Sequence, residues 1–179
     1  MPDIKTRLSR AVIVLILGGA GSTAILSQFL DEKEGNRLNA YRDAGGVWTI
    51  CRGITHIDGQ PVKKGMKLTA TQCEQFNQIE ARKAITWVKR NVHTPLTEPQ
   101  VAGIASFCPY NIGPAKCFSS TFYRKLNSGD KKGACAEIKL WIYDGGRDCR
   151  QTNGKYGGCY GQIDRRDQES ELVCWELNK

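Results

Sequence analysis

Three side chains in one short stretch could form an acid–base site. Glu34 ends a predicted helix, Asp43 follows nine residues later in a predicted turn, and Thr49 lies six residues further on in a predicted strand. Two carboxylates in a cleft are typical of glycoside hydrolysis: one carboxyl group donates a proton to the leaving oxygen, and the other orients water or stabilises positive charge on the sugar. A hydroxyl such as that of Thr49 can help to hold the attacking water. Judged on spacing alone, Glu34 and Asp43 are more often ordinary solvated charges.

A longer pattern surrounds these three residues. Residues 34–43 read EGNRLNAYRD, and the pattern continues with Gly46, Thr49 and Gly53. It resembles the active-site signature of the T-even type phage lysozymes, and more closely that of lambdoid phage and prophage endolysins with signal-anchor-release segments. The resemblance implies hydrolysis, by an inverting route, of the β-1,4 bond between N-acetylmuramic acid and N-acetylglucosamine in peptidoglycan, which lyses the host cell. It also implies that Glu34 is the general acid, Asp43 the second catalytic carboxylate and Thr49 the catalytic hydroxyl.

One position departs from this family pattern. The family commonly has Gly-His after the strand, whereas this chain has Gly53 and Ile54, with His56 two residues on. No family role is therefore carried over to His56. We expect the missing imidazole to affect stability or cleft shape more than the chemistry.

The far wall of the cleft is predicted in residues 106–113, which read SFCPYNIG. This segment resembles the family stretch that lines the sugar site, and its position makes Tyr110 and Asn111 candidate substrate-binding residues. Aromatic and amide groups are typical of polar-lined pockets. The alternative is an ordinary turn, since Pro109 and Gly113 flank them.

These side chains need an α+β framework that is mainly helical. The resemblance implies a lysozyme-like fold, with a small β-hairpin subdomain beside a helical lobe and an N-terminal hydrophobic segment in front. Composition predicts a strand at residues 47–51 and a hairpin turn at residues 58–59. Capping and apolar patterns predict a helix that begins at residue 97 and further helices at residues 68–92, 119–127, 131–143 and 162–177. Residues 147–161 are predicted to form a surface loop. Leu38 and Tyr41 could continue a helical face from Leu30, and Phe76 and Ile79 are predicted to be core residues.

Residues 11–30 form an uncharged segment that follows Lys5, Arg7 and Arg10. A single helix of this length would span roughly 30 Å, about the thickness of a hydrocarbon core. Glycines and polar residues make the segment only weakly apolar, so crossing should be marginal. Three alternatives remain: a cleaved signal peptide, a permanent anchor, and an anchor that can leave the bilayer, of which the last explains the glycines best.

We therefore expect residues 1–30 to be a signal-anchor-release segment and residues 31–179 to be the catalytic domain, with the first helix running into the anchor. The chain would be tethered to the host inner membrane and then released to the periplasm. Glu34 lies four residues beyond this segment. A membrane-held segment would pin the catalytic helix at the lipid surface, so the tethered chain is predicted to be inactive.

Eight cysteines favour a disulfide framework in an oxidising compartment. Zinc is the alternative, but the sequence contains no Cys-x-x-Cys, and neither histidine has a ligand-like spacing. Local loops suggest two pairs, Cys108 with Cys117 and Cys149 with Cys159. The remaining cysteines give the hypothesis of Cys51 with Cys73 and Cys135 with Cys174. No metal or other cofactor is expected.

The formal charge of +8 favours polyanions, and charge alone does not choose among nucleic acid, anionic lipid and an acidic envelope. With the resemblance, we expect peptidoglycan glycan strands and the inner membrane as partners, no nucleic acid, and a monomer. Two other functions stay open: a lytic transglycosylase, which cleaves the same bond and leaves an anhydro end, and a membrane-anchored, disulfide-rich binding module without catalysis.

Overall fold

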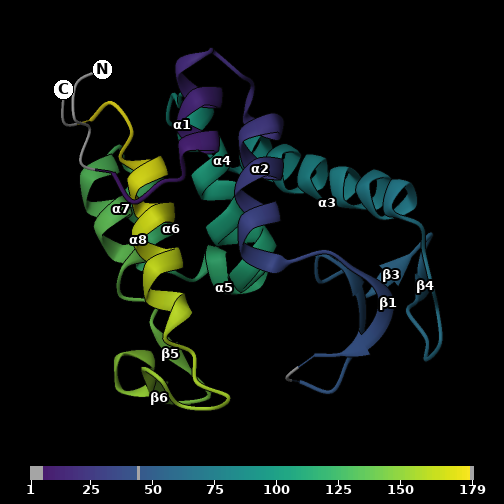
Figure 1. Cartoon of the computed structure of the whole chain (residues 1–179). Helices are drawn as coiled ribbons and strands as arrows, with labels where there is room; N and C mark the ends of the chain where they lie inside the picture. The colour runs from purple at the N-terminus through teal and green to yellow at the C-terminus, as the bar shows by residue number, and fades with distance from the viewer. Residues whose placement is uncertain (1–5, 44, 178–179) are drawn as a thin grey trace.

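The computed structural model describes residues 6–43 and 45–177. Most helices gather in one lobe, strands β1 to β4 form a small subdomain beside it, and the long helix α3 runs from one to the other (Figure 1). The expected class, a mainly helical lysozyme-like fold with a small β-hairpin subdomain, is confirmed.

The N-terminal segment forms two short helices, α1 (Arg10–Leu17) and α2 (Ser22–Glu34). The single helix over residues 11–30 that crossing a membrane would require is not present in this structure. Gly19 has φ +74°, a left-handed conformation that favours glycine, and it reverses the chain between the two helices. Within residues 6–43 and 45–177, no helix has the length and apolar character needed to cross a membrane.

The β-subdomain begins where α2 ends. Gly35 (φ +64°) terminates α2, and β1 (Arg37–Arg42) pairs antiparallel with β2 (Trp48–Cys51). Leu38 and Tyr41 therefore lie on a strand, so their placement on a continued helical face is wrong. Strands β3 (His56–Ile57) and β4 (Gln60–Pro61) form a second hairpin. Its turn residues Asp58 and Gly59 both have positive φ, as the predicted hairpin turn requires.

Helix α3 (Ala70–Asn91) begins at the capping box of Thr69 and Gln72, and α4 (Glu98–Ala105) begins at the corresponding box of Thr97 and Gln100. Both capping signals are confirmed. The side chain of Ile79 is an exception among the predicted core residues of α3, because 38% of it is exposed.

The remaining elements complete the helical lobe. They are the π-helical segment η1 (Ser106–Ile112), α5 (Pro114–Phe118), α6 (Thr121–Asn127), α7 (Lys131–Ile138), the hairpin β5 (Tyr143–Asp144) and β6 (Arg147–Asp148), the 3-10 turn η2 (Cys149–Thr152) and α8 (Gly161–Val173). The helix predicted over residues 131–143 ends at Ile138, and Tyr143 belongs to a hairpin whose turn is Gly145 and Gly146. The predicted turn at Pro109 is a helical bulge instead.

One apolar core runs through the helical lobe, and the N-terminal helices belong to it. Six of its buried residues come from residues 8–30: Leu8, Val12, Ile25, Leu26, Phe29 and Leu30. Close packing between α4 and α8 depends on Gly103, because a Cβ at this position would lie 2.7 Å from Cβ of Leu172. A second, smaller core, which includes Ile50, Ile54 and Val62, fills the β-subdomain.

All eight cysteines are paired in the structure. The pairs are the four of the sequence hypothesis: Cys51–Cys73, Cys108–Cys117, Cys135–Cys174 and Cys149–Cys159. Three of the bonds span 9 to 22 residues, and Cys135–Cys174 spans 39. None of the four joins a strand of the β-subdomain to an element that follows α3.

Candidate active site

A cavity of about 840 Å³ lies between the β-subdomain and the helical lobe. Its walls come from the end of α2, the hairpins of the β-subdomain, one face of α3, and the segment that joins η1 to α5. Four of the five predicted site residues line it: Glu34, Asp43, Tyr110 and Asn111. The structure thus brings together carboxylates that are nine residues apart in the chain with side chains more than sixty residues further on.

Glu34 is the last residue of α2, and its side chain is fixed from the opposite end of the chain. Nη1 of Arg165, on α8, lies 2.5 Å from Oε1 of Glu34. The exposed fractions of the two side chains are 11% for Arg165 and 23% for Glu34, so the ion pair is shielded from bulk water on most sides. Among the described residues no hydrogen bond is recorded to Oε2 of Glu34, which is left for a ligand in the cavity.

Arg165 belongs to a buried charge network. Its Nε lies 3.1 Å from Oε1 of the fully buried Glu169, which also accepts a hydrogen bond from Ser106. Glu169 pairs in turn with Arg166, whose guanidinium donates to Oδ1 of Asn111. Burial lowers the pKa of Arg165, but the charges of Glu169 and Glu34 more than offset this, and the pKa lies above its ordinary value. Arg165 therefore keeps its charge beside Glu34.

The sequence analysis missed this network. The prediction for residues 162–177 was a helix, and it assigned no role to the charged residues Arg165, Arg166 and Glu169. The available signal was the i, i+3 and i, i+4 spacing of opposite charges on one helix. That spacing is also typical of a solvated surface, so it could not show that these charges are buried against Glu34.

Asp43 follows β1 and is exposed to the cavity. Its Oδ1 accepts a hydrogen bond of 2.9 Å from the backbone N–H of Val47, and its own N–H donates to the carbonyl of Val47 at 3.0 Å. The turn that closes the first hairpin therefore orients the carboxylate. No described residue makes a hydrogen bond to Oδ2, so this oxygen remains available.

Thr49 does not line the cavity. It lies in β2 with only 2% of the residue exposed, and its hydroxyl donates to the carbonyl of Val47 at 3.1 Å. Val47 therefore contacts both Asp43 and Thr49. The hydroxyl oxygen can still accept a hydrogen bond from water, but a role in holding water would require access to the cavity, which Thr49 does not line in this structure.

Tyr110 and Asn111 reach the cavity from η1, and both are held by the protein. The phenol of Tyr110 donates to the backbone carbonyl of Arg52 at 2.7 Å, which ties the helical lobe to the end of β2. Burial, and then the charge of Glu34, raise the pKa of Tyr110 well above its ordinary value, so the phenol stays a donor at physiological pH. The Asn111 carbonyl is occupied by Arg166, and its amide N–H groups remain for a ligand.

Arg52 also lines the cavity and was not predicted as a site residue. Its side chain, 5% exposed, pairs with Asp31 of α2 at 2.7 Å and with Glu74 of α3 at 3.2 Å. Its backbone N–H donates to Asn77 of α3. Arg52 thus joins α2, β2 and α3 at the base of the cleft.

Ile54 stands where the resemblance would place histidine. It is 5% exposed and packs in the core of the β-subdomain, where its backbone pairs with Ile50 through two hydrogen bonds of 2.9 Å. Ile54 contributes to packing and also lines the cavity, and the effect of the missing imidazole on stability or cleft shape stays a prediction.

The fold is that of a lysozyme, and the comparisons with known proteins agree. The model of the phage lysozyme family matches residues 31–169. The chain therefore belongs to the phage lysozyme family, and it is a glycoside hydrolase of the endolysin type that acts on peptidoglycan.

Several relatives extend the match to almost the whole chain. The chain is 64% identical to the "SAR-endolysin" of Escherichia phage N15 over 98% of both chains. It is 60% identical to a "probable prophage lysozyme" of Escherichia coli strain K12, again over 98% of both chains. Among solved structures, the endolysin of Escherichia coli O157:H7 phage FAHEc1 is 31% identical with a TM-score of 0.67, covering 85% of this chain and 89% of that chain.

Proposed function

We propose that the chain hydrolyses the β-1,4 bond between N-acetylmuramic acid and N-acetylglucosamine, with Glu34 as general acid, Asp43 as second carboxylate and Thr49 as the hydroxyl that holds water. One observation carries this proposal: Glu34 and Asp43 line the same cavity from different elements. A family resemblance at both positions supports it.

The contacts of the two carboxylates suit different roles. Glu34 has Oε1 fixed by Arg165, so the proton of the acid form belongs on Oε2, from which it can reach the leaving glycosidic oxygen. Asp43 has Oδ1 fixed by the turn, and Oδ2 can orient water or stabilise positive charge on the sugar. Each residue is thus positioned through one oxygen and reacts through the other.

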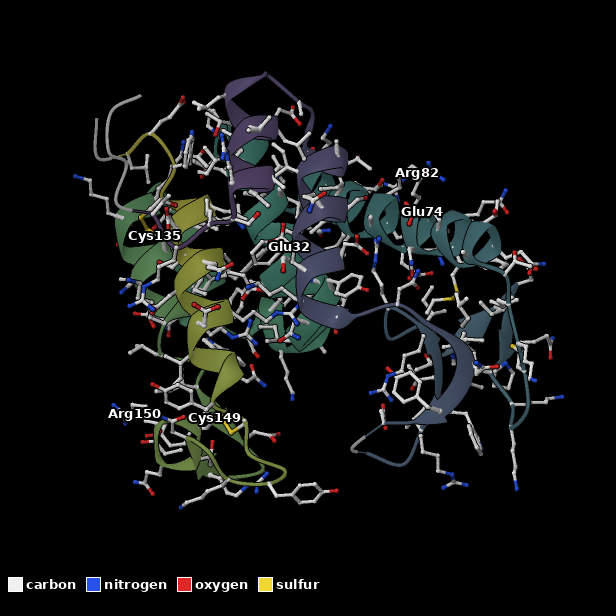
Figure 2. The ribbon with its side chains drawn as sticks, viewed as in Figure 1. Glu32, Glu74, Arg82, Cys135, Cys149 and Arg150 are labelled. Carbon is white, nitrogen blue, oxygen red and sulfur yellow. A yellow bond between two sulfur atoms is a disulfide. The ribbon has the colours of Figure 1, made fainter. Side chains whose placement is uncertain are left out.

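Substitution of Glu34 tests the proposal in the full-length, disulfide-bonded chain. Glu34→Gln should abolish the loss of turbidity of a cell-wall suspension, because an amide cannot donate the proton. The matched control is Glu32→Gln, two residues earlier on α2, where an exposed carboxylate accepts hydrogen bonds from Ser9 and Gln28 (Figure 2). The proposal fails if Glu34→Gln clears the walls as fast as the control.

Product analysis separates hydrolysis from the alternatives. Hydrolysis adds water and leaves a reducing N-acetylmuramic acid end, whereas a lytic transglycosylase leaves an anhydro end of lower mass. An inverting route also predicts the α-anomer as the first product, which nuclear magnetic resonance detects before the anomers equilibrate. Intact walls after incubation would favour the non-catalytic binding module.

We further propose that residues 1–30 hold the chain in the host inner membrane and that the two-helix form is the one released to the periplasm. Relatives named SAR-endolysins and the packing of α1 and α2 in the core support this. Residues buried in the core cannot lie in lipid at the same time. While the segment spans the bilayer, α2 cannot dock and Glu34 cannot meet Arg165.

A chain tethered by a strongly apolar span in place of residues 11–30 should therefore lack lytic activity at equal expression. The matched comparison is the natural chain, assayed in membrane and periplasmic fractions. Equal activity of the tethered and released forms would contradict the proposal that release from the membrane switches on lytic activity.

A further inference from the structure

A second groove runs along the exposed face of α3, next to the cleft. Its volume is about 480 Å³, and every residue that lines it belongs to α3. Three of these residues, Ile79, Lys83 and Trp87, also line the cleft. The groove, which we call the α3 groove, is therefore a continuation of the cleft.

The α3 groove carries positive charge that the protein leaves unpaired. Arg82 and Arg90 line it, are exposed, and make no ion pair with any residue in the described part of the chain. Arg82 projects from α3 into solvent (Figure 2). The two arginines lie eight residues apart, about 12 Å along the helix, with Thr86 between them on the same face. Lys83 differs, because it pairs with Glu80 at 2.7 Å.

A favourable interaction with the helix dipole can explain only one of the two unpaired arginines. Arg90 lies in the last turn of α3, where a cation interacts favourably with the helix dipole. Arg82 lies in the middle of the helix, where that interaction is absent. Neither an ion pair with a described residue nor the helix dipole therefore accounts for the charge of Arg82.

A rigid aromatic wall borders the same groove. The ring of Trp87 lies 5.1 Å from that of Phe118 and 6.2 Å from that of Tyr123, which are themselves 5.3 Å apart. Trp87 is thereby fixed by two neighbours while it still lines both the cleft and the groove. A fixed aromatic ring between two sites can contact a ligand that extends from one into the other.

We infer that the α3 groove binds an acidic peptide, the stem peptide that branches from the glycan strand in the cleft. This inference rests on the proposed function. The sugars of peptidoglycan bear few charges apart from their peptides, whose carboxylates are suitable partners for arginine. The groove shares a wall with the glycan cleft, so a branch of a bound strand can enter it without leaving the protein surface.

Paired substrates test the inference in the full-length chain. One is peptidoglycan with its stem peptides, and the other is the same glycan after an amidase has removed them. Arg82→Gln with Arg90→Gln should lower kcat/KM on the peptide-bearing strands about tenfold (~1.4 kcal/mol). The loss should lie mainly in KM and should be at least several times smaller on the peptide-free strands. The control, Lys131→Gln with Lys132→Gln, removes two charges at the start of α7, outside both cavities.

Three outcomes would overturn the inference. Equal losses on both substrates would show that the arginines act on the glycan or on the fold, and an unchanged melting temperature would exclude the fold. No loss on either substrate would show that the groove is not used. A loss confined to binding of vesicles with anionic lipid would assign the groove to a membrane.

A direct binding experiment separates this inference from the proposed function. The Glu34→Gln chain is titrated with free stem peptide, followed by tryptophan fluorescence and by nuclear magnetic resonance. Binding that Arg82→Gln with Arg90→Gln removes would support the groove even if the assignment of Glu34 proved wrong. Absence of binding to the Glu34→Gln chain, while the natural chain cleaves peptide-free glycan, would overturn the groove alone.

Discussion

Arg165 places Glu34 more directly than any residue near it in the sequence. One guanidinium reaches both Glu34, through Nη1, and Glu169, through Nε. Glu169 is fully buried, pairs with Arg166 and accepts a hydrogen bond from Ser106. These contacts fix Glu169, which in turn fixes the position of Arg165. The position of the Glu34 carboxyl group is thus set by Arg165 of α8, 131 residues away in the chain.

Arg165→Lys should lower kcat by about tenfold or more, because an ammonium keeps the charge but cannot contact both carboxylates in this geometry. KM should change little, since Arg165 does not line the cavity. Steady-state kinetics on cell walls measure this split. Arg150→Lys, at an exposed pair with Asp148, is the control. A fall in melting temperature without a change in kcat would show a purely structural role.

The N-terminal end of α2 is joined to the rest of the helical lobe by a contact with α4. The break between α1 and α2 creates a new helix N-terminus at Ser22, whose backbone N–H has no partner on α2. Glu98 of α4 supplies one, with Oε2 at 2.5 Å from that nitrogen. Hydrogen bonds from the Ser22 side chain and backbone hold the pKa of Glu98 below its ordinary value. Glu98 therefore joins the start of α2 to α4.

Glu98→Gln should lower the melting temperature at pH 7 by about 2–4 °C, as expected for the loss of a charged cap worth about 1 kcal/mol or less. Because the folded-state pKa is depressed, this stabilisation is present above the unfolded value near 4.5 and is lost as the pH falls through the folded value. Melting curves of variant and natural chain should therefore converge in acid. A constant difference between pH 3 and pH 7 would contradict the charged cap.

The elements were predictable where their signals are local. Capping boxes predicted the starts of α3 and α4, and the Asp58–Gly59 turn predicted the second hairpin. Errors arose where distant contacts decide the outcome. Tyr41 suits a helical face by spacing, yet Gly35 ends α2 and pairing with Thr49 makes a strand. Ile79 suits a core by spacing, but it lies where α3 crosses the open cleft.

The site was predictable to the extent that its residues share one short motif. Glu34 and Asp43 were found this way, and they do line one cavity. Arg165 and Arg52 were not, because the spacing of charges in the sequence does not show which of them are buried, and both pair with a carboxylate of α2, Glu34 and Asp31 respectively. The role of Thr49 stays a prediction, since its hydroxyl faces the Val47 carbonyl.

At the scale of the whole molecule, the disulfides stabilise each part on its own. Cys51–Cys73 joins β2 to the start of α3, and Cys135–Cys174 joins α7 to the end of α8 across 39 residues. Cys108–Cys117 closes a loop of only 9 residues between η1 and α5. If restriction of the unfolded chain is the main effect, the longer loop gives more stability.

Replacement of Cys135 and Cys174 by Ala should cost about 4 kcal/mol of unfolding free energy, against about 2.5 kcal/mol for Cys108 and Cys117. Urea denaturation of both double variants measures the difference. The reverse order would show that local packing of the cystines, rather than chain entropy, sets their contribution. Peptide mapping without reduction provides the accompanying check of the four pairs.

The burial of residues 8–30 has a consequence for timing. If residues 1–30 first span the bilayer, as we propose, the side chains of Val12, Ile25 and Phe29 must leave the lipid before they can pack in the protein core. A more apolar segment would lie longer in lipid, and a less apolar one would leave sooner but fill the core less well. On this proposal, one set of side chains sets both the delay before lysis and the stability of the enzyme that carries it out.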